Sequence, residues 1–243
     1  MPNVRLTIEF DGTNYAGWQI QAQQPTIQGI LQNGLKKIFG QDICVYGCGR
    51  TDAGVSAHNY VANFHCPDRL PPARIAAALN FYLPSDIFVK AAEIVPDDFH
   101  ARYSALTKTY SYSIICNRSP LRRRFAWEIY HPLNLKRLQR GARLFLGKKD
   151  FNAFCSIRSG KGICTIRLIR VIRKGDEIVI KITGDRFLYK MVRRIVGSLV
   201  AYAAGKITLK DIKAALIGKN SKPFTAAPAQ GLILDRVSYP KYR

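Results

Sequence analysis

Alternation of apolar and polar residues predicts that the chain begins with a β-strand. In residues 3–10 every second side chain is apolar, as expected of a strand with one buried face. Thr26 can cap a following helix through its hydroxyl, and Gly40 can end that helix in a left-handed conformation. Between these two residues apolar side chains recur at helical spacing, at positions 27, 30, 31, 35 and 38. We therefore predict a strand followed by an amphipathic helix.

The pattern continues with two strands, a helix and a further strand. The apolar run at residues 43–48 predicts a buried strand, and residues 60–64 predict the next one. A Pro-Pro pair at 71–72 can open a helix that ends before Pro84, and residues 87–95 predict a fourth strand. The order is βαββαβ, with both helices able to cover one face of the sheet.

The second half of the chain repeats this order without obvious sequence identity. The predicted elements are a strand over 107–116, a helix from 134 to 147, a hairpin of 165–173 with 177–183, helices over 187–204 and 209–217, and a last strand over 232–237. We predict a mixed α+β fold with two domains, residues 1–105 and 106–243. Their sheets could join edge to edge, with the join near residues 97–108.

Positive charge is concentrated in the second half of the chain. The net charge is +22; residues 1–100 contain 7 Lys and Arg against 9 Asp and Glu, whereas residues 101–243 contain 31 against 7. Such a basic half-chain is typical of a protein that binds a polyanion. A basic surface kept for solubility, or a membrane-facing patch, would not place the charge on folded, periodic segments. Nucleic acid is the favoured partner.

We expect a soluble, cytoplasmic protein that makes no membrane contact. The first residues run directly into the first predicted strand without a basic and then apolar leader, so we expect no signal peptide. The longest apolar run, near residues 195–204, is too short to cross a bilayer.

The cysteines do not indicate a metal site. The six cysteines have no framework spacing, and we expect them to be buried free thiols in a reducing compartment. Cys44 and Cys48 would lie about 13 Å apart on a strand that rises roughly 3.3 Å per residue. At that separation they could not share one zinc ion.

The loop Gly49-Arg50-Thr51-Asp52-Ala53-Gly54-Val55, between two predicted strands, carries the candidate chemistry. Glycines on both sides give the backbone freedom to turn. A carboxylate on a tight loop can be aimed precisely, and Arg50 can keep Asp52 ionised. On spacing alone, an Asp that caps its own turn beside a solvated Arg explains the loop better.

Basic residues are interleaved with apolar ones in the predicted strand at 165–173. Arg167, Arg170 and Arg173 could contact phosphates from an exposed side of that strand. Solvated charges that discourage edge-to-edge aggregation are nearly as good an explanation for each of them.

A series of motifs in one order resembles the tRNA pseudouridine synthase A family, which acts on the anticodon arm. The motifs are Phe10-Asp11-Gly12-Thr13 with Tyr15 and Gly17-Trp18-Gln19, the loop at 49–55, Asp98-Phe99-His100-Ala101-Arg102, Lys108-Thr109-Tyr110-Ser111-Tyr112, Asp150-Phe151 with Phe154-Cys155, and residues 187–197. Any one of these would be a weak signal, but the ordered set spans the chain and is specific. One departure is Ser56, which stands where the family commonly has His, so no role is assigned to a histidine.

The resemblance implies the fold, the reaction and the site residues. It implies tandem ferredoxin-like (RRM-like) halves whose antiparallel sheets join into one larger sheet with the helices on one face. It places the catalytic nucleophile at Asp52 and the active-site tyrosine at Tyr110. It also places the late-helix arginine at Arg193, and Arg50 beside the nucleophile becomes a candidate substrate contact.

The implied reaction isomerises uridine to pseudouridine in the anticodon arm, at tRNA positions 38–40, after the base is flipped out of its stem at a cost of a few kcal/mol. The N1 glycosidic bond breaks, the base rotates and the link re-forms through C5. No redox step or group donor is involved, so no cofactor and no metal are expected. Asp52 would add covalently, an ion pair with Arg193 could stabilise its charge in a closed pocket, and Tyr110 would stack on the uracil and assist loss of the C5 proton.

Structural alternatives remain for each of these partners. Tyr110 could be a core tyrosine of an alternating strand, and Arg50 could form a purely structural ion pair. Of Arg193 and the neighbouring Arg194, we expect one to face solvent.

The resemblance also implies a homodimer with the tRNA lying across both subunits. A different class of function is a non-catalytic RNA-binding protein with tandem RRM-like halves, in which Tyr110 and Tyr112 would stack on bases. That function leaves the Asp52 loop without a purpose. A nuclease with paired carboxylates and Mg²⁺ lacks a second acidic cluster near Asp52.

Overall fold

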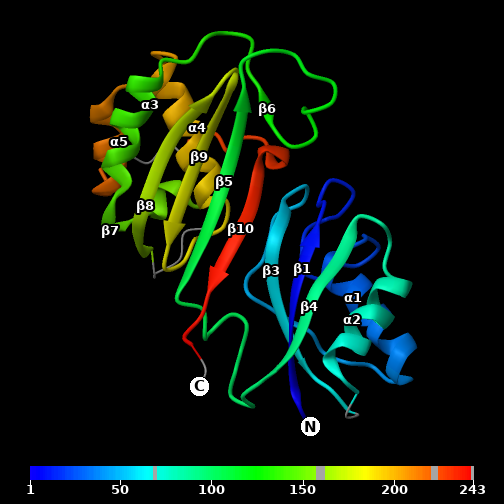
Figure 1. Cartoon of the computed structure of the whole chain (residues 1–243). Helices are drawn as coiled ribbons and strands as arrows, with labels where there is room; N and C mark the ends of the chain where they lie inside the picture. The colour runs from blue at the N-terminus through cyan, green and yellow to red at the C-terminus, as the bar shows by residue number, and fades with distance from the viewer. Residues whose placement is uncertain (68–69, 157–161, 220–223, 242–243) are drawn as a thin grey trace. The chain divides into compact units, whose positions relative to one another are not determined.

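The structure, a computed structural model, describes residues 1–67, 70–156, 162–219 and 224–241. It divides into two compact units, which we call the N-terminal unit (Met1–Leu106 with Ile233–Arg243) and the C-terminal unit (Thr107–Leu232). Each unit combines a β-sheet with helices (Figure 1). The mixed α+β class expected from the sequence is therefore confirmed.

The sheet of the N-terminal unit is organised around β1 (Asn3–Phe10). β1 pairs antiparallel with β3 (Ser56–His65) on one side and with β4 (Ile87–Val95) on the other. β3 also pairs antiparallel with the short β2 (Tyr46–Gly47) and parallel with β10 (Leu232–Ser238). The apolar positions of β1 are buried, as its alternating pattern predicts: Val4, Leu6, Ile8 and Phe10.

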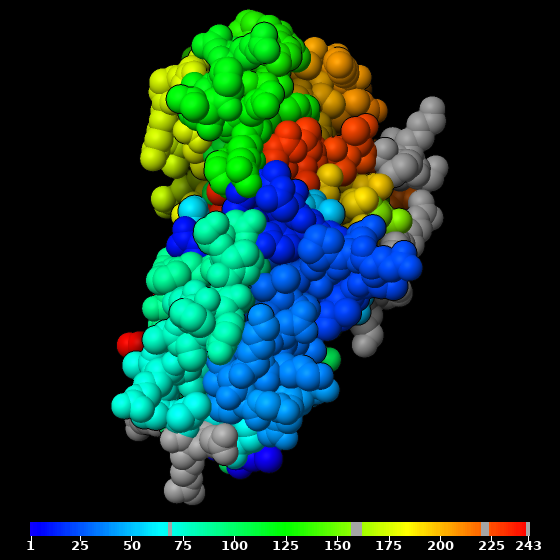
Figure 2. All heavy atoms as spheres, turned by 90° about the vertical axis from the view of Figure 1, so that its right-hand side faces the viewer, coloured from blue at the N-terminus to red at the C-terminus, as the bar shows by residue number. Residues whose placement is uncertain are grey.

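Two helices lie side by side in the N-terminal unit, α1 (Ile27–Phe39) and α2 (Pro72–Tyr82) (Figure 2). The Thr26 hydroxyl accepts the N–H of Gly29 at 3.3 Å, so it caps α1 as predicted. Gly40 ends α1 at φ 70°. From β1 to β4 the elements follow the predicted order βαββαβ.

The sheet of the C-terminal unit contains four antiparallel strands in the order β5, β9, β8, β7. Their bounds are β5 Thr107–Ile115, β9 Glu177–Gly184, β8 Ile163–Lys174 and β7 Gly147–Asp150. A short strand, β6 (Trp127–Glu128), pairs parallel with β5. The hairpin of β8 and β9 confirms the predicted hairpin, whereas β6 and β7 were not predicted.

Helices α3 (Leu135–Ala142) and α4 (Met191–Ala203) pack on each other in the C-terminal unit. A Cβ on Gly141 would lie 2.9 Å from a methyl carbon of Leu199, so the two helices approach closely at this glycine. The remaining helices are α5 (Leu209–Leu216) and the 3₁₀ turns η1 (Arg143–Phe145), η2 (Asn152–Phe154) and η3 (Ala229–Gly231).

The strand predicted over residues 43–48 is reduced to β2. The backbone before β2 bonds to side chains of α1 instead of to a neighbouring strand. The Val45 N–H donates to Gln32 Oε1 at 3.4 Å, and Gln28 Nε2 donates to the Val45 carbonyl at 2.9 Å. The run is apolar because Ile43 and Val45 are buried, and not because it belongs to the sheet.

Two predicted helices have different bounds. The helix expected over 187–204 begins only at Met191, because Lys190 adopts a left-handed φ of 60° and interrupts the helical backbone. The helix expected from 134 to 147 ends at Ala142 and continues as η1, and Gly147 already belongs to β7. The six cysteines are free, but Cys44 is exposed and Cys116 is only half-buried, which corrects the expectation that all would be buried.

Candidate functional site

The loop that carries Asp52 runs from Cys48 to Val55 between β2 and β3. Its first residue is fixed by a bond from the Cys48 N–H to the Val61 carbonyl at 2.8 Å. A tight turn closes where the Val55 N–H donates to the Asp52 carbonyl at 3.2 Å, and Gly54 takes a φ of 77° in that turn. Asp52 is half-buried and Arg50 is exposed. The loop therefore holds the carboxylate in a defined position while leaving access to it.

The segment after β1 supports this loop through its backbone. The Trp18 N–H donates to the Thr51 carbonyl and the Gly54 N–H donates to the Tyr15 carbonyl, both at 3.2 Å. A Cβ on Gly17 would lie 2.3 Å from the Thr51 carbonyl oxygen, and Gly17 has a φ of 98°. Only glycine fits both requirements. The Gly17-Trp18 motif of the sequence is therefore the support of the Asp52 loop.

Ser56 closes the other end of the loop. Its buried hydroxyl accepts the N–H of Gly12 at 3.0 Å, and a Cβ on Gly12 would lie 2.1 Å from the Val55 carbonyl oxygen. Ser56 thus stabilises the start of β3. His58 points to the exposed side, with its Nδ1 3.5 Å from Glu9 Oε1.

An aromatic pair lies under the start of the loop. The rings of Trp18 and Tyr60 stack with their centroids 4.3 Å apart, and both side chains are buried. The Tyr60 hydroxyl donates to the Gly49 carbonyl at 2.5 Å, and a Cβ on Gly47 would lie 2.2 Å from that hydroxyl oxygen. Sequence reasoning missed Tyr60 as a support of the loop. No local sequence signal links Tyr60 to Gly49, because only the fold brings these two residues together.

In the C-terminal unit, Tyr110 and Tyr112 occupy alternate positions of β5 and differ in burial. Tyr112 is fully buried, and its hydroxyl donates to the Pro228 carbonyl at 2.8 Å. Burial raises the pKa of Tyr112, and the nearby guanidinium of Arg193 opposes that rise. Tyr110 is only half-buried and makes an edge-to-face contact with Phe187, at 5.2 Å between ring centroids. Tyr112, and not Tyr110, is the core tyrosine of this strand.

Arg193 is anchored at the start of α4. Its Nε donates to the Ala227 carbonyl at 2.7 Å, and its own carbonyl accepts the Ala227 N–H at 3.0 Å. Arg194 Nη1 donates to the Cys155 carbonyl at 3.0 Å. Both arginines are half-buried, so the expectation that one of them faces solvent is wrong. The four site residues named from the sequence fall into two groups: Arg50 and Asp52 in the N-terminal unit, Tyr110 and Arg193 in the C-terminal unit.

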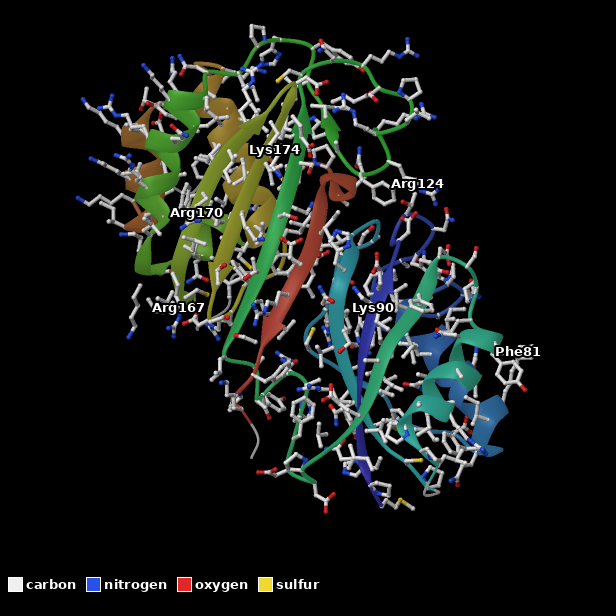
Figure 3. All side chains as sticks on the ribbon, in the orientation of Figure 1. Phe81, Lys90, Arg124, Arg167, Arg170 and Lys174 are labelled. Carbon is white, nitrogen blue, oxygen red and sulfur yellow. The ribbon has the colours of Figure 1, made fainter. Side chains whose placement is uncertain are left out.

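The basic residues of β8 are exposed (Figure 3). Arg167 occupies a register shift between Ile166 and Leu168, Arg170 lies directly opposite Lys181 of β9, and Lys174 ends the strand. Arg173 Nε donates to the Gly175 carbonyl at 3.0 Å in the hairpin turn. Arg167 and Arg170 are therefore accessible on this strand, whereas Arg173 also supports the turn.

Neither a metal cluster nor a membrane-spanning helix occurs in the described ranges. Across those residues, no three His, Cys, Asp or Glu side chains come together in a way that could hold a metal ion. Within the same ranges, every helix is too short or too polar to traverse a bilayer.

Comparisons with known proteins agree with the motif series. A family model described as tRNA pseudouridine synthase matches residues 6–104 and 142–240. The chain is 41% identical over 245 residues to tRNA pseudouridine synthase A of Thermoanaerobacter sp. (strain X514), covering 98% of this chain and 100% of the relative. It is 40% identical over 246 residues to tRNA pseudouridine synthase A of Ruminiclostridium cellulolyticum, and 43% identical over 247 residues to that of Rhodopseudomonas palustris (strain BisA53), with the same shares covered.

Proposed function

Because the chain belongs to the tRNA pseudouridine synthase A family and is therefore an isomerase, we propose that it converts uridine to pseudouridine in the anticodon arm of tRNA with Asp52 as the nucleophile. The observation that carries this proposal is the support given to the Asp52 loop. Backbone bonds from the segment at residues 15–18, a buried serine and a buried tyrosine all restrain it. So many restraints on a polar surface loop are expected where a reacting group must be held within a fraction of an ångström.

The proposed reaction conserves every atom of the substrate except one exchanged proton. The Asp52 carboxylate adds covalently to the base or to C1′ of the ribose. The bond between N1 and C1′ breaks, the uracil rotates, and a bond forms between C5 and C1′. The proton on C5 then leaves to solvent while N1 gains one, and the carboxylate is released. Because the product is an isomer of the substrate, the proposed reaction needs no cofactor.

The other site residues take roles that follow their chemistry. Tyr110, with its half-exposed ring, stacks on the uracil and assists removal of the C5 proton through its hydroxyl. Arg193 supplies positive charge that favours the ionised form of the Asp52 carboxylate. Arg50, exposed beside the nucleophile, holds a phosphate or fills the space that a flipped base leaves in its stem.

The proposed function extends to the fold, the oligomeric state and the contact with RNA. The chain contains two ferredoxin-like halves, which the βαββαβ order of the N-terminal unit supports for the first of them. The protein acts as a homodimer in the cytoplasm. The strongly basic C-terminal half of the sequence binds the phosphates of the RNA stem, which the charge difference between the two halves supports.

The alternative of a non-catalytic RNA-binding protein loses its main support. Base stacking on β5 would require both Tyr110 and Tyr112 to be accessible. Tyr112 is fully buried and its hydroxyl is bonded to the Pro228 carbonyl. The alternating tyrosines therefore do not form a stacking platform.

Release of tritium from tRNA labelled as [5-³H]uridine, without added metal, tests the proposed function. Asp52→Asn removes the charge of the nucleophile while keeping its shape, so we expect no tritium release. The affinity for tRNA should stay within about twofold of that of the unchanged protein, because an affinity dominated by phosphate contacts does not depend on this carboxylate. Asp42→Asn is the matched control, since Asp42 is exposed outside the loop and pairs with Lys36. Retained turnover in Asp52→Asn would refute the role of Asp52.

A further inference from the structure

An open depression of about 240 Å³ lies beside the Asp52 loop, within the N-terminal unit. Part of its lining comes from β2 and the residues that follow it, including Tyr46 and Arg50. A second wall comes from the segment after β4, with His100, Arg102 and Tyr103, and it meets the first where His100 contacts Tyr46. Asp52 does not line the depression, although Arg50 at its rim is only two residues away. It is a separate surface that adjoins the proposed catalytic loop.

Aromatic rings form one side of this depression. His100 lies between Tyr46 and Tyr103, with its ring centroid 5.2 Å from the first and 4.5 Å from the second. Tyr103 is 77% exposed and Tyr46 is 45% exposed. Large aromatic side chains are seldom left so accessible without a binding role when they cluster around a cavity.

The polar groups of the lining are cationic or neutral. Arg50 and Arg102 contribute positive charge, and the described lining residues include no carboxylate. The guanidinium of Arg102 lies 5.6 Å from the centroid of the Tyr103 ring. Gln19 Nε2 donates to Gln28 Oε1 at 3.0 Å, so two side-chain amides are also oriented at this site. Two guanidinium groups without a lining carboxylate mark a local site for an anion.

The wall that carries His100 and Arg102 is held by two buried asparagines. Asn3 Nδ2 donates to the Phe99 carbonyl at 2.8 Å, and Asn63 Oδ1 accepts the Ala101 N–H at 2.9 Å. Asn63 Nδ2 donates to Asn3 Oδ1 at 3.0 Å, which joins the two side chains. Both asparagines are at most 1% exposed. Buried, fully bonded amides of this kind fix a single backbone geometry, so the wall is preformed.

The imidazole of His100 lies in this wall in its neutral form. Its burial, together with the positive charge of Arg102, lowers the pKa of His100. Its Nδ1 accepts the N–H of Arg102 at 3.1 Å, which leaves Nε2 to carry the proton of the neutral form. A neutral imidazole between two tyrosines presents a flat aromatic face without adding to the charge already supplied by the arginines.

We propose that this depression binds a nucleotide adjacent to the target uridine, with its unstacked base on Tyr103 and Tyr46 and its phosphate on Arg102 and Arg50. Stacking of bases on aromatic side chains, combined with cationic groups along the backbone, is how proteins hold single-stranded nucleotides. Flipping a uridine out of its stem disturbs the stacking of its neighbour. A preformed stacking surface next to the catalytic loop replaces the contacts that this neighbour loses. The inference rests on the proposed function, because the target uridine defines which nucleotide is adjacent.

Binding of unmodified tRNA in the catalytically silent Asp52→Asn background tests the inference. Tyr103→Ala and Arg102→Ala should each weaken tRNA binding about tenfold, the scale of one lost base stack or one lost phosphate contact. Tyr103→Phe keeps the ring and should restore binding. The matched controls, Phe81→Ala and Arg74→Ala, remove an exposed aromatic and an exposed arginine from α2 and should bind as the background does (Figure 3).

A second measurement identifies the nucleotide. Photo-crosslinking of tRNA carrying 5-bromouridine or 4-thiouridine next to the modified position should join that nucleotide to Tyr103 or Tyr46, as read by mass spectrometry.

If Tyr103→Ala and Arg102→Ala match their controls while the unchanged protein releases tritium, the inference is overturned and the proposed function stands. If the variants weaken binding but no uridine is isomerised, the proposed function fails and the depression remains a nucleotide site. Crosslinking only to distant nucleotides would also overturn the inference.

Discussion

Gly17 determines how closely the segment after β1 approaches the Asp52 loop. Its φ of 98° is rarely adopted by a residue with a side chain, and the space a Cβ would need is occupied by the Thr51 carbonyl. A side chain here must push back the backbone one residue before the proposed nucleophile. The position of Asp52 therefore depends on the absence of a Cβ at residue 17.

Replacement of Gly17 should affect activity more than replacement of a glycine with similar backbone strain. We expect Gly17→Ala to lower the free energy of unfolding by more than about 1 kcal/mol and to reduce tritium release by at least tenfold. Gly175→Ala is the control, because Gly175 has a φ of 61° in the turn between β8 and β9 and nothing lies within 4 Å of its Cβ position. Urea unfolding and tritium release measure the two effects. Equal activity in the two variants would show that the approach at Gly17 does not position the loop.

At the scale of secondary-structure elements, local signals determine where several helices begin and end. Thr26 caps α1, and the Thr208 hydroxyl and the Asp211 carboxylate form a reciprocal capping box at the start of α5. The pKa of Asp211 is lowered by the backbone N–H and the hydroxyl of Thr208, which both donate to its carboxylate. These contacts lie within a few residues of each other, so they can be inferred from sequence alone.

Loss of the α1 cap should cost stability without changing the fold. Thr26→Ala leaves the Gly29 N–H without the hydroxyl that accepts it, and we expect a loss of about 1 kcal/mol in the free energy of unfolding. Thr26→Ser keeps a hydroxyl at the cap and should retain most of that stability. Urea denaturation with unchanged m-values provides the measurement. A loss in Thr26→Ser equal to that in Thr26→Ala would indicate packing of the methyl group as the cause.

Elements whose conformation is decided by distant contacts were not predictable. Residues 43–45 read as a strand because they are apolar, but their backbone bonds to side chains of α1. The start of α4 was misplaced because nothing in the local pattern indicates the left-handed Lys190. In the candidate site, the motif order located Asp52, whereas the supports at Gly12, Ser56 and Tyr60 became visible only once segments remote in sequence were brought together.

At the scale of the whole molecule, positive charge is distributed unevenly along the sequence. Arg170 and Lys181 lie directly opposite each other on β8 and β9, and both are exposed. Like charges in this arrangement destabilise a sheet, and a bound phosphate would neutralise that repulsion. The concentration of basic residues after residue 100 thus favours a polyanion over any smaller ligand.

The affinity for tRNA should fall steeply with salt, because each neutralised phosphate releases counterions. We expect Arg170→Gln to lower the slope of log K against log salt by about one. Lys90→Gln is the matched control, since Lys90 lies on β4 with its Nζ 3.1 Å from Glu9 Oε2 (Figure 3). Equilibrium binding over a salt series measures both slopes. An unchanged slope in Arg170→Gln would remove β8 from the proposed phosphate surface.

The parallel pairing of β10 with β3 has a consequence for synthesis of the protein. β3 belongs to the first hundred residues, yet Ile233 and Leu234 of β10 occupy its edge, and Ser238 accepts the N–H of Leu106 at 2.8 Å. On the ribosome, β3 is made long before its parallel neighbour, so during translation the Ser56–Ala57 end of that edge has no strand to cover it, whereas β2 already pairs with Ala62 and Asn63. Exposed strand edges can recruit other chains, so we expect this end of β3 to be open to such pairing until β10 emerges.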